Sequence, residues 1–270
     1  IAAQPTVTIE GWAYGEEPNA PQVELEGNEG AEYTFTYRGT PNGGSYTDFG
    51  QTPPTLAGEY TVMVTVGASR NYTGGSSSAY AFTISRAAVS APTLNSKTYT
   101  GGTLTAEVLT DDRYTVSANE GGVNVGTYSV TLSLTDTNNY KWADEADGVR
   151  DTTVSWQIVK AKVDAPSLAE SSTVYTEAQQ DNEIIGYIAG RFEFSSDNTA
   201  TVRENFVYAT DAGTYTVTAS LAGGNAANYT LVGTHAATVI VARAYVSVPE
   251  IASKEYTGEA LTADIAKNDL

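Results

Sequence analysis

Residues 126–134 read Gly126-Thr127-Tyr128-Ser129-Val130-Thr131-Leu132-Ser133-Leu134. Apolar and small polar residues alternate along this stretch. Successive side chains point to opposite faces of a strand, so a period of two indicates a strand with one buried and one wet face. We therefore expect Tyr128, Val130 and Leu132 to be buried and the Thr and Ser residues between them to be exposed.

Two near-copies of this strand occur elsewhere in the chain. Residues 58–66 read GEYTVMVTV and residues 213–221 read GTYTVTASL, with Met63 as the one break in the alternation. A strand that recurs three times predicts three β modules, each built around one copy. The residues that we expect to be buried in these copies are Tyr60, Val62, Val64, Tyr215 and Val217.

A second repeated phrase, Arg/Lys-Ala-x-Val, marks the boundaries between the modules. It begins at Arg86, Lys160 and Arg243, and a proline follows each Val after three residues. Each phrase comes directly after an alternating strand without a Gly/Ser linker, which predicts a stiff hinge rather than a flexible tether. We therefore place the first module at residues 1–86, the second at 87–160, the third at 161–243 and the truncated start of a fourth at 244–270, with strands at Val246–Pro249 and Leu261–Ile265.

Two shorter phrases complete the repeat. Tyr-Thr-Gly or a variant of it occurs at residues 14–16, 99–101, 175–177 and 256–258, where it is expected to open a second strand. Asn-Tyr occurs at 71–72, 139–140 and 228–229, where the hairpin between the last two strands should turn. Asparagine suits turn conformations, and the tyrosine can cover the end of a small core. Helical periodicity is almost missing, so the pattern predicts an all-β chain.

Asp211-Ala212-Gly213-Thr214-Tyr215-Thr216-Val217 resembles the Asp-x-Gly-x-Tyr-x-Cys motif of immunoglobulin domains, with Val217 at the cysteine position. In that family the tyrosine bonds back to the preceding turn, and the alternate residue faces the core. Together the phrases also resemble the Ig-like and MBG-type repeats of bacterial surface proteins and adhesins. The resemblance implies tandem small Ig-like β-sandwich modules, end to end.

The second module departs from a full immunoglobulin domain. Only residues 118–125 separate its strand at 114–117 from Gly126, which leaves no room for the middle strands of a domain of roughly 100 residues. A reduced sandwich, or another small β fold such as a β-grasp, is therefore an open alternative.

Composition limits the partners. The chain has 14 Lys+Arg against 32 Asp+Glu, a net charge of -18, and a pI near 4.2. Such a negative field disfavours nucleic acid and anionic membrane as partners, and no apolar stretch approaches the 18 residues needed to insert in a membrane.

Cysteine is absent, which excludes disulfides, thiol nucleophiles and zinc–thiolate sites. The chain begins at Ile1 without a visible signal peptide, so we interpret it as cut from a longer extracellular protein.

The sequence predicts no catalytic residue and no cofactor. His235 is the only histidine, so a histidine-based triad has no placed partner.

Lys97 and Lys254 occupy equivalent positions before Tyr-x-Gly phrases, where surface proteins of the resembled type sometimes carry a Lys–Asn or Lys–Asp isopeptide bond. The third module has no lysine at the corresponding position, which argues against that crosslink.

A weak calcium candidate lies in a long acidic loop of the second module. Its acidic residues are Asp144, Glu145, Asp147 and Asp151. Carboxylate oxygens suit calcium, but the spacing does not match an EF-hand loop. A solvated loop is the simpler interpretation.

Trp142 and Tyr140 beside this loop are the candidates for ligand binding. An exposed aromatic platform would support a host glycan, whereas packing of Trp142 against its own loop is the simpler interpretation. Trp156 aligns with Phe82 and Val239 in the last strands of the other modules, so it is expected in the core.

These observations favour a non-catalytic stalk, spacer or adhesin segment of a bacterial cell-surface or secreted protein. One alternative is a module that binds a host glycan or an extracellular protein. Another is an accessory region of a large secreted enzyme whose chemistry lies elsewhere.

Overall fold

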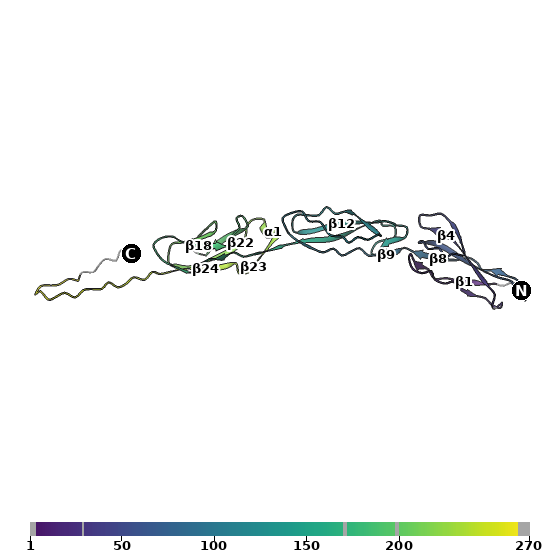
Figure 1. The fold of residues 1–270 in the computed structure, drawn as a ribbon, viewed down its shortest axis with the longest axis horizontal. Helices are drawn as coiled ribbons and strands as arrows, with labels where there is room; N and C mark the ends of the chain where they lie inside the picture. Colours follow the sequence, from purple (N-terminus) through teal and green to yellow (C-terminus); the bar gives the residue numbers. More distant parts are fainter. Residues whose placement is uncertain (1–3, 29, 170–171, 198–199, 264–270) are drawn as a thin grey trace. The chain divides into compact units, whose positions relative to one another are not determined.

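The computed structural model describes residues 4–28, 30–169, 172–197 and 200–263. Strands dominate these residues, and the one helix among them is the four-residue α1 (Asn225–Asn228) (Figure 1). The chain divides into two compact units, Ile1–Val159 and Lys160–Leu270. The division lies one residue before the predicted end of the second module, and the first unit holds both of the first two modules.

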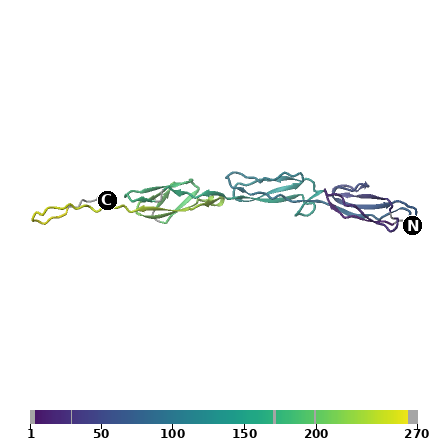
Figure 2. The same cartoon turned by 60° about the horizontal axis from the view of Figure 1, so that its bottom comes forward.

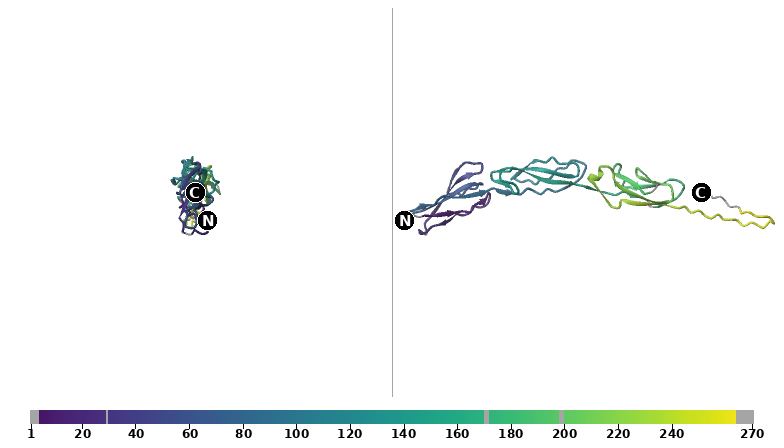
Figure 3. Two further views of the ribbon diagram at one scale, coloured as in Figure 1. Left: turned by 90° about the vertical axis from the view of Figure 1, so that its right-hand side faces the viewer. Right: turned by 180° about the vertical axis from the view of Figure 1, so that it is seen from behind.

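The first module is a two-layer β-sandwich. Its larger sheet has the order β2 (Trp12–Ala13), β8 (Tyr80–Ser85), β6 (Gly58–Val66), β4 (Tyr33–Pro41), β5 (Thr47–Gly50), and β7 (Gly75–Ser76) pairs with β6. The other layer is the antiparallel pair of β1 (Thr6–Thr8) and β3 (Gln22–Glu24). Figure 3 shows β1 in dark purple beside the blue strands of the larger sheet. Val7 from the small layer and Tyr60, Val62 and Phe82 from the large one share a core.

The second module has a reduced second layer. Its main sheet has the order β10 (Lys97–Thr98), β14 (Asp151–Val159), β12 (Gly126–Leu134), β11 (Tyr114–Ala118). The other layer holds only the parallel pair of β9 (Ala87–Val89) and β13 (Tyr140–Trp142) and irregular segments. Val89 and Trp142 from this layer pack in one core with Leu132 and Trp156 of the main sheet. The short connection before Gly126 therefore gives a reduced sandwich, which is one of the alternatives that its length left open.

The third module has two four-stranded sheets. One has the order β17 (Ser172–Val174), β24 (Ala236–Ala242), β22 (Gly213–Leu221), β19 (Phe192–Ser196), and the other β16 (Ser167–Leu168), β18 (Gln180–Ile185), β21 (Phe206–Ala209), β20 (Thr201–Arg203). A parallel pair of β15 (Ala161–Asp164) and β23 (Tyr229–Val232) completes the module. Ile184 and Val207 from one sheet meet Val217 and Val239 from the other in its core.

The same pairing order recurs in all three main sheets. A short opening strand runs parallel to the last strand, and the last strand runs antiparallel to the Gly-x-Tyr strand. The Gly-x-Tyr strand also pairs antiparallel with an earlier strand of its module, which is β4, β11 or β19. In the described part of the chain no helix packs on a sheet, unlike a β-grasp. The chain is an all-β array of small Ig-like sandwich modules, as the sequence predicts.

The three Gly-x-Tyr strands explain why these cores form. Val62, Val130 and Leu132 are fully buried, and Tyr60, Tyr215 and Val217 are no more than 4% exposed. Several residues differ from expectation. Thr61, Thr131 and Thr216 are half-buried rather than exposed. Tyr128 is only half-buried because its ring lies against Trp156 at the border of the core, and Ser133 is buried because its hydroxyl bonds to Asp151 of the neighbouring strand.

The strand tyrosines all bond to the carbonyl four residues upstream. The Tyr60 hydroxyl donates to the Leu56 oxygen (2.8 Å), that of Tyr128 to the Asn124 oxygen (2.7 Å) and that of Tyr215 to the Asp211 oxygen (2.6 Å). This is the tyrosine-corner geometry that the immunoglobulin resemblance implies. The bond fixes the turn that leads into each central strand.

The Tyr-Thr-Gly phrases end the short opening strands rather than opening them, which corrects the expectation. The N–H of Tyr14, Tyr99 and Tyr175 donates to the carbonyl of Ser85, Val159 and Ala242, respectively, at 2.8–2.9 Å. Each tyrosine thus marks where the parallel pairing with the last strand stops.

Residues 244–263 form neither helix nor strand, and most of their side chains are exposed. Figures 1 and 2 draw this segment in yellow as a plain chain. The strand expected at Val246–Pro249 is therefore not formed. The strand expected at Leu261–Ile265 lies partly outside the described residues, and its described part, 261–263, is not paired.

Candidate functional site at the junction of the first two modules

A single residue, Arg86, connects the last strand of the first module with the opening strand of the second. Strand β8 ends at Ser85, and β9 begins at Ala87. The Asn-Tyr phrase of the second module supplies the partner of β9, because Tyr140 pairs with Ala87 in parallel register and the Ala87 N–H donates to the Asn139 oxygen at 2.9 Å. The third module repeats this pairing between Ala161 and Tyr229. The two phrases that recur in the sequence are thus structural partners.

The side chain of Asn139 is the centre of the junction. Asn139 is 8% exposed, and its Oδ1 accepts the N–H of Ala57 in the first module at 3.0 Å. Ala57 is fully buried, so this N–H has no access to water as a substitute acceptor. The Asn139 Nδ2 donates to Asp136 Oδ2 at 2.7 Å, which orients the amide.

Asp136 holds the loop in shape. Its Oδ1 accepts the N–H groups of Asn138 (2.9 Å) and Asn139 (3.3 Å), and its carbonyl accepts the N–H of Tyr140 (3.0 Å). Partial burial raises the pKa of Asp136, but the hydrogen bonds from the Asn139 side chain and the two backbone N–H groups outweigh it and lower the pKa below its ordinary value. The carboxylate is therefore ionised at neutral pH, in the form that accepts these bonds.

Three more contacts join the loop to the first module. The Asn42 Nδ2 donates to the Asn138 oxygen at 2.9 Å, and the Arg86 Nε donates to the Thr137 oxygen at 2.8 Å. The rings of Tyr14 and Tyr140 meet edge to face, with centroids 5.3 Å apart. Together with the Asn139 bond, these contacts join the loop to the first module at four points.

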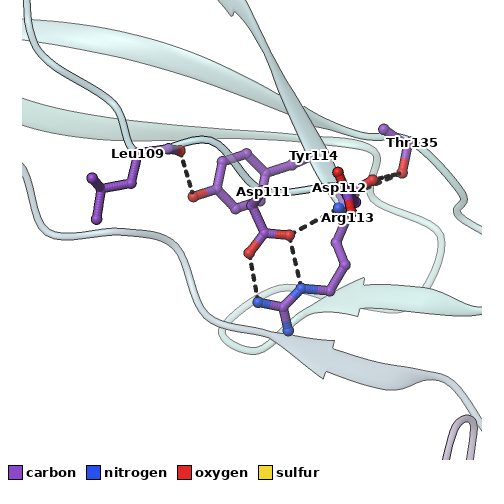
Figure 4. A network of polar contacts seen from close by, with 6 residues as sticks. All are labelled: Leu109, Asp111, Asp112, Arg113, Tyr114 and Thr135. Carbon is purple, nitrogen blue, oxygen red and sulfur yellow. Dashed lines mark hydrogen bonds and ion pairs between the residues drawn. The ribbon is translucent and has the colours of Figure 1, made fainter.

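The start of the loop is anchored inside the second module (Figure 4). The Thr135 hydroxyl lies 2.9 Å from the Asp112 oxygen and 3.0 Å from the Arg113 oxygen. Arg113 in turn makes a two-point ion pair with Asp111, at 2.9 and 2.6 Å, and the Tyr114 hydroxyl lies 3.4 Å from the Leu109 oxygen. The Arg113 side chain is the main cause that lowers the pKa of Asp111 to about 2. This turn therefore fixes the strand end from which the junction loop departs.

The acidic loop serves ion pairs rather than a calcium site. Asp147 lies 3.1 Å from both Arg86 Nη1 and Lys141 Nζ, and the Lys141 bond is the main cause that lowers its pKa. Asp151 Oδ1 accepts the Ser133 hydroxyl, whereas Asp144 and Glu145 are exposed. Within the described ranges no three acidic or histidine side chains gather as metal ligands. These carboxylates point to different partners, so the described geometry does not bring the weak calcium candidate together.

Trp142 cannot serve as an exposed platform for a sugar. It is 2% exposed, its Nε1 donates to the Arg150 oxygen at 2.9 Å, and its ring packs against Tyr114. The expectation of a binding surface at Trp142 is therefore wrong, and packing into its own module is the observed role. Tyr140 is half-buried in the junction against Tyr14.

The other candidates lie apart from the junction. Lys97 Nζ is 2.7 Å from Glu107 Oε1, an exposed carboxylate and not the Asn or Asp of an isopeptide bond. Lys254 lies in the exposed segment 244–263. His235 is exposed, and its Nδ1 is 3.1 Å from the Gly233 oxygen. Trp156 is 2% exposed in the core, as expected.

Asn139, Asp136 and Ala57 were missed as junction residues by sequence reasoning. The recurring Asn-Tyr and Arg/Lys-Ala phrases carried the signal, since repeated phrases with no catalytic chemistry often hold structural contacts. Their pairing with each other joins residues more than 50 positions apart and leaves no local pattern.

No family model matches the chain, and no curated protein matches it. Among solved structures, the chain is similar to one described as the crystal structure of Drosophila N-cadherin EC1-4, with a TM-score of 0.26 and 11% identity over 90% of this chain and 76% of that chain. At this TM-score the similarity carries no argument about fold or function. In the described part of the chain no helix is long and apolar enough to cross a membrane.

Proposed function

We propose that the chain is a non-catalytic spacer of a bacterial cell-surface or secreted protein, in which stiff joints between β modules hold attached domains at a distance. The observation that supports this proposal is the first junction. It has one connecting residue, Arg86, and a buried hydrogen bond between Asn139 and Ala57 across the joint. The acidic, cysteine-free composition is in keeping with a location outside the cell.

Bending this joint has a definite free-energy cost. Separating Asn139 from Ala57 exchanges their hydrogen bond for bonds to water, a net cost of about 0.5–1.5 kcal/mol, and the bonds from Asn42 and Arg86 to the loop are lost with it. Parting the rings of Tyr14 and Tyr140 costs about 0.5–1.5 kcal/mol more. Since each 1.4 kcal/mol changes an equilibrium by a factor of ten, bent forms of the joint should make up less than about a tenth of the molecules. A spacer requires a joint of this kind.

Spin-label distance measurements test the proposal directly. The chain has no cysteine, so Ala81→Cys in the first module and Ser129→Cys in the second give one label each, both at exposed strand positions. A pair within the first module, Thr52→Cys with Ala81→Cys, gives the width expected of a rigid body. We expect the pair across the junction to be nearly as narrow as this reference, and to broaden when three flexible residues are inserted after Arg86.

A broad distance distribution in the unmodified chain would contradict a spacer role. Arrays of glycans and extracellular proteins, probed with the same chain, test the adhesin alternative. A pure spacer gives no reproducible signal, whereas saturable binding to one ligand class would replace the spacer role with a binding function.

A further inference from the structure

The third module carries at its far end the same three phrases that form the first module's side of the junction. Tyr175-Thr176-Glu177 corresponds to Tyr14-Gly15-Glu16, Asp211-Ala212 to Leu56-Ala57, and Arg243-Ala244 to Arg86-Ala87. The backbone geometry agrees, because the opening tyrosine bonds to the last strand and the strand tyrosine bonds to its turn in both modules. The two ends are therefore built alike.

Their surroundings differ. In the first module Ala57 is fully buried beneath the Asn139 loop, whereas the corresponding Ala212 is exposed. The three phrases of the third module line a pocket of about 480 Å³, which includes Tyr175, Asp211, Ala212 and Arg243. The position that the Asn139 loop fills in the first module is therefore an open pocket in the third module.

The pocket is lined by the acidic residues Glu177 and Asp211 and also by three hydrogen-bond donors that have counterparts in the first junction. In the first junction Ala57 N–H, Ala87 N–H and Arg86 Nε all donate to oxygens of the Asn139 loop. Their counterparts are the N–H groups of Ala212 and Ala244 and the guanidinium of Arg243, and none of the three makes a hydrogen bond to another described residue. The pocket thus suits an asparagine side-chain oxygen, two backbone carbonyls and a carboxylate, which is what the Asn139 loop and Asp147 provide to the first module.

We propose that this pocket docks the Asn-Tyr loop of a further β module of the same type, joined in register at Arg243. Residues 244–258 repeat the phrases that open the second module, and several of their apolar side chains are more exposed than their counterparts there. Val246 is 63% exposed, whereas its counterpart Val89 is fully buried. A module that buries Val246 would bring its own Asn-Tyr loop to the pocket. This inference rests on the geometry of the first junction and not on the spacer role.

The test is an insertion that leaves every native residue of the chain unchanged. A second copy of residues 87–160 is inserted between Arg243 and Ala244, which recreates the Arg-Ala connection of the first junction. Amide hydrogen exchange is followed by NMR at Ala212, with Ala57 in the same molecule as the positive control. We expect Ala212 to exchange at least tenfold more slowly than in the unmodified chain. Asn139→Ala in the inserted copy alone should abolish that protection.

Fast exchange at Ala212 would overturn the proposal if the inserted copy shows the amide spectrum of a folded second module. If the copy does not fold, the unmodified chain is titrated with a peptide of residues 134–143. If the peptide perturbs the resonances of Ala212 and Arg243 and the Asn139→Ala peptide does not, the result supports docking of the loop in the pocket. If millimolar peptide perturbs neither resonance, the proposal is overturned. Sedimentation tests whether a second copy of the chain occupies the pocket instead. If the unmodified chain associates and Arg243→Ala abolishes that association, a second copy binds there and the proposal is overturned.

Discussion

Replacing Asn139 with alanine should uncouple the first two modules. The substitution removes the acceptor of the Ala57 N–H, a group that is fully buried, and the donor to Asp136 Oδ2. An unpaired buried N–H costs about 1–3 kcal/mol, and loss of the second bond adds about 1 kcal/mol because Asp136 keeps its backbone donors. We therefore expect a loss of about 2–4 kcal/mol in the stability of the joint.

Native-state hydrogen exchange measures this loss at the bond itself. Because 1.4 kcal/mol corresponds to a factor of ten, the Ala57 amide should exchange roughly 30- to 1000-fold faster in the variant. The matched control is Asn71→Ala, which changes the equivalent Asn-Tyr phrase of the first module, where the side chain is exposed. This control should change stability by no more than about 0.5 kcal/mol.

Equal effects of Asn139→Ala and Asn71→Ala on Ala57 exchange would refute the reasoning. So would an unchanged Ala57 in the Asn139 variant, because the buried hydrogen bond could then not be what holds the joint.

Three further outcomes follow from the same geometry. Tyr60→Phe and Tyr215→Phe each remove a hydroxyl that bonds the preceding turn, and each should lower the stability of its module by about 1 kcal/mol in urea unfolding; no change in either would contradict a role for the tyrosine corner. Leu132→Ala should cost about 2–5 kcal/mol because Leu132 is fully buried, whereas Thr127→Ala on the exposed face of the same strand should be nearly neutral; equal costs would contradict the assigned faces. Asp111 has a folded-state pKa of about 2, below its ordinary value of 3.8, so the stability that it contributes is present above about pH 4 and is lost as the pH falls toward 2. Near-UV circular dichroism of the tryptophans should show the midpoint of acid unfolding move upward in the Asp111→Asn variant relative to a control at exposed Asp144, and equal midpoints would contradict this assignment.

The sequence predicted the central strands because their signal is local. Alternation in residues 58–66, 126–134 and 213–221 places Val62, Val130 and Val217 on the buried face, and one face of a strand must lie against a core. The resemblance of residues 211–217 to the immunoglobulin motif also implied the hydroxyl bond of Tyr215. These features need no knowledge of distant residues.

The short parallel pairings were not predicted, because their signal is not local. Parallel strands need long connections, so the partners of Ala87 and Lys97 lie more than 50 residues away, and strands of two or three residues are too short for a period to appear. Trp142 illustrates the same limit. Its position beside an acidic loop left an exposed binding surface open beside the simpler interpretation of packing, and the pairing of β13 with β9 places it in the core of the second module. The junction role of Asn139 depends on that same pairing.

Pulling single molecules from their two ends tests the central claim that the chain is a series of separately folded modules, the first two of which are joined by a stiff, structured junction. We expect three unfolding steps, each releasing on the order of 200–250 Å of chain, since a module of roughly 80 residues extends at about 3.6 Å per residue and loses its folded length. Asn139→Ala should lower the force of the step that opens the first junction without changing the number of steps. One continuous extension, or a single step that releases the first two modules together, would contradict the account.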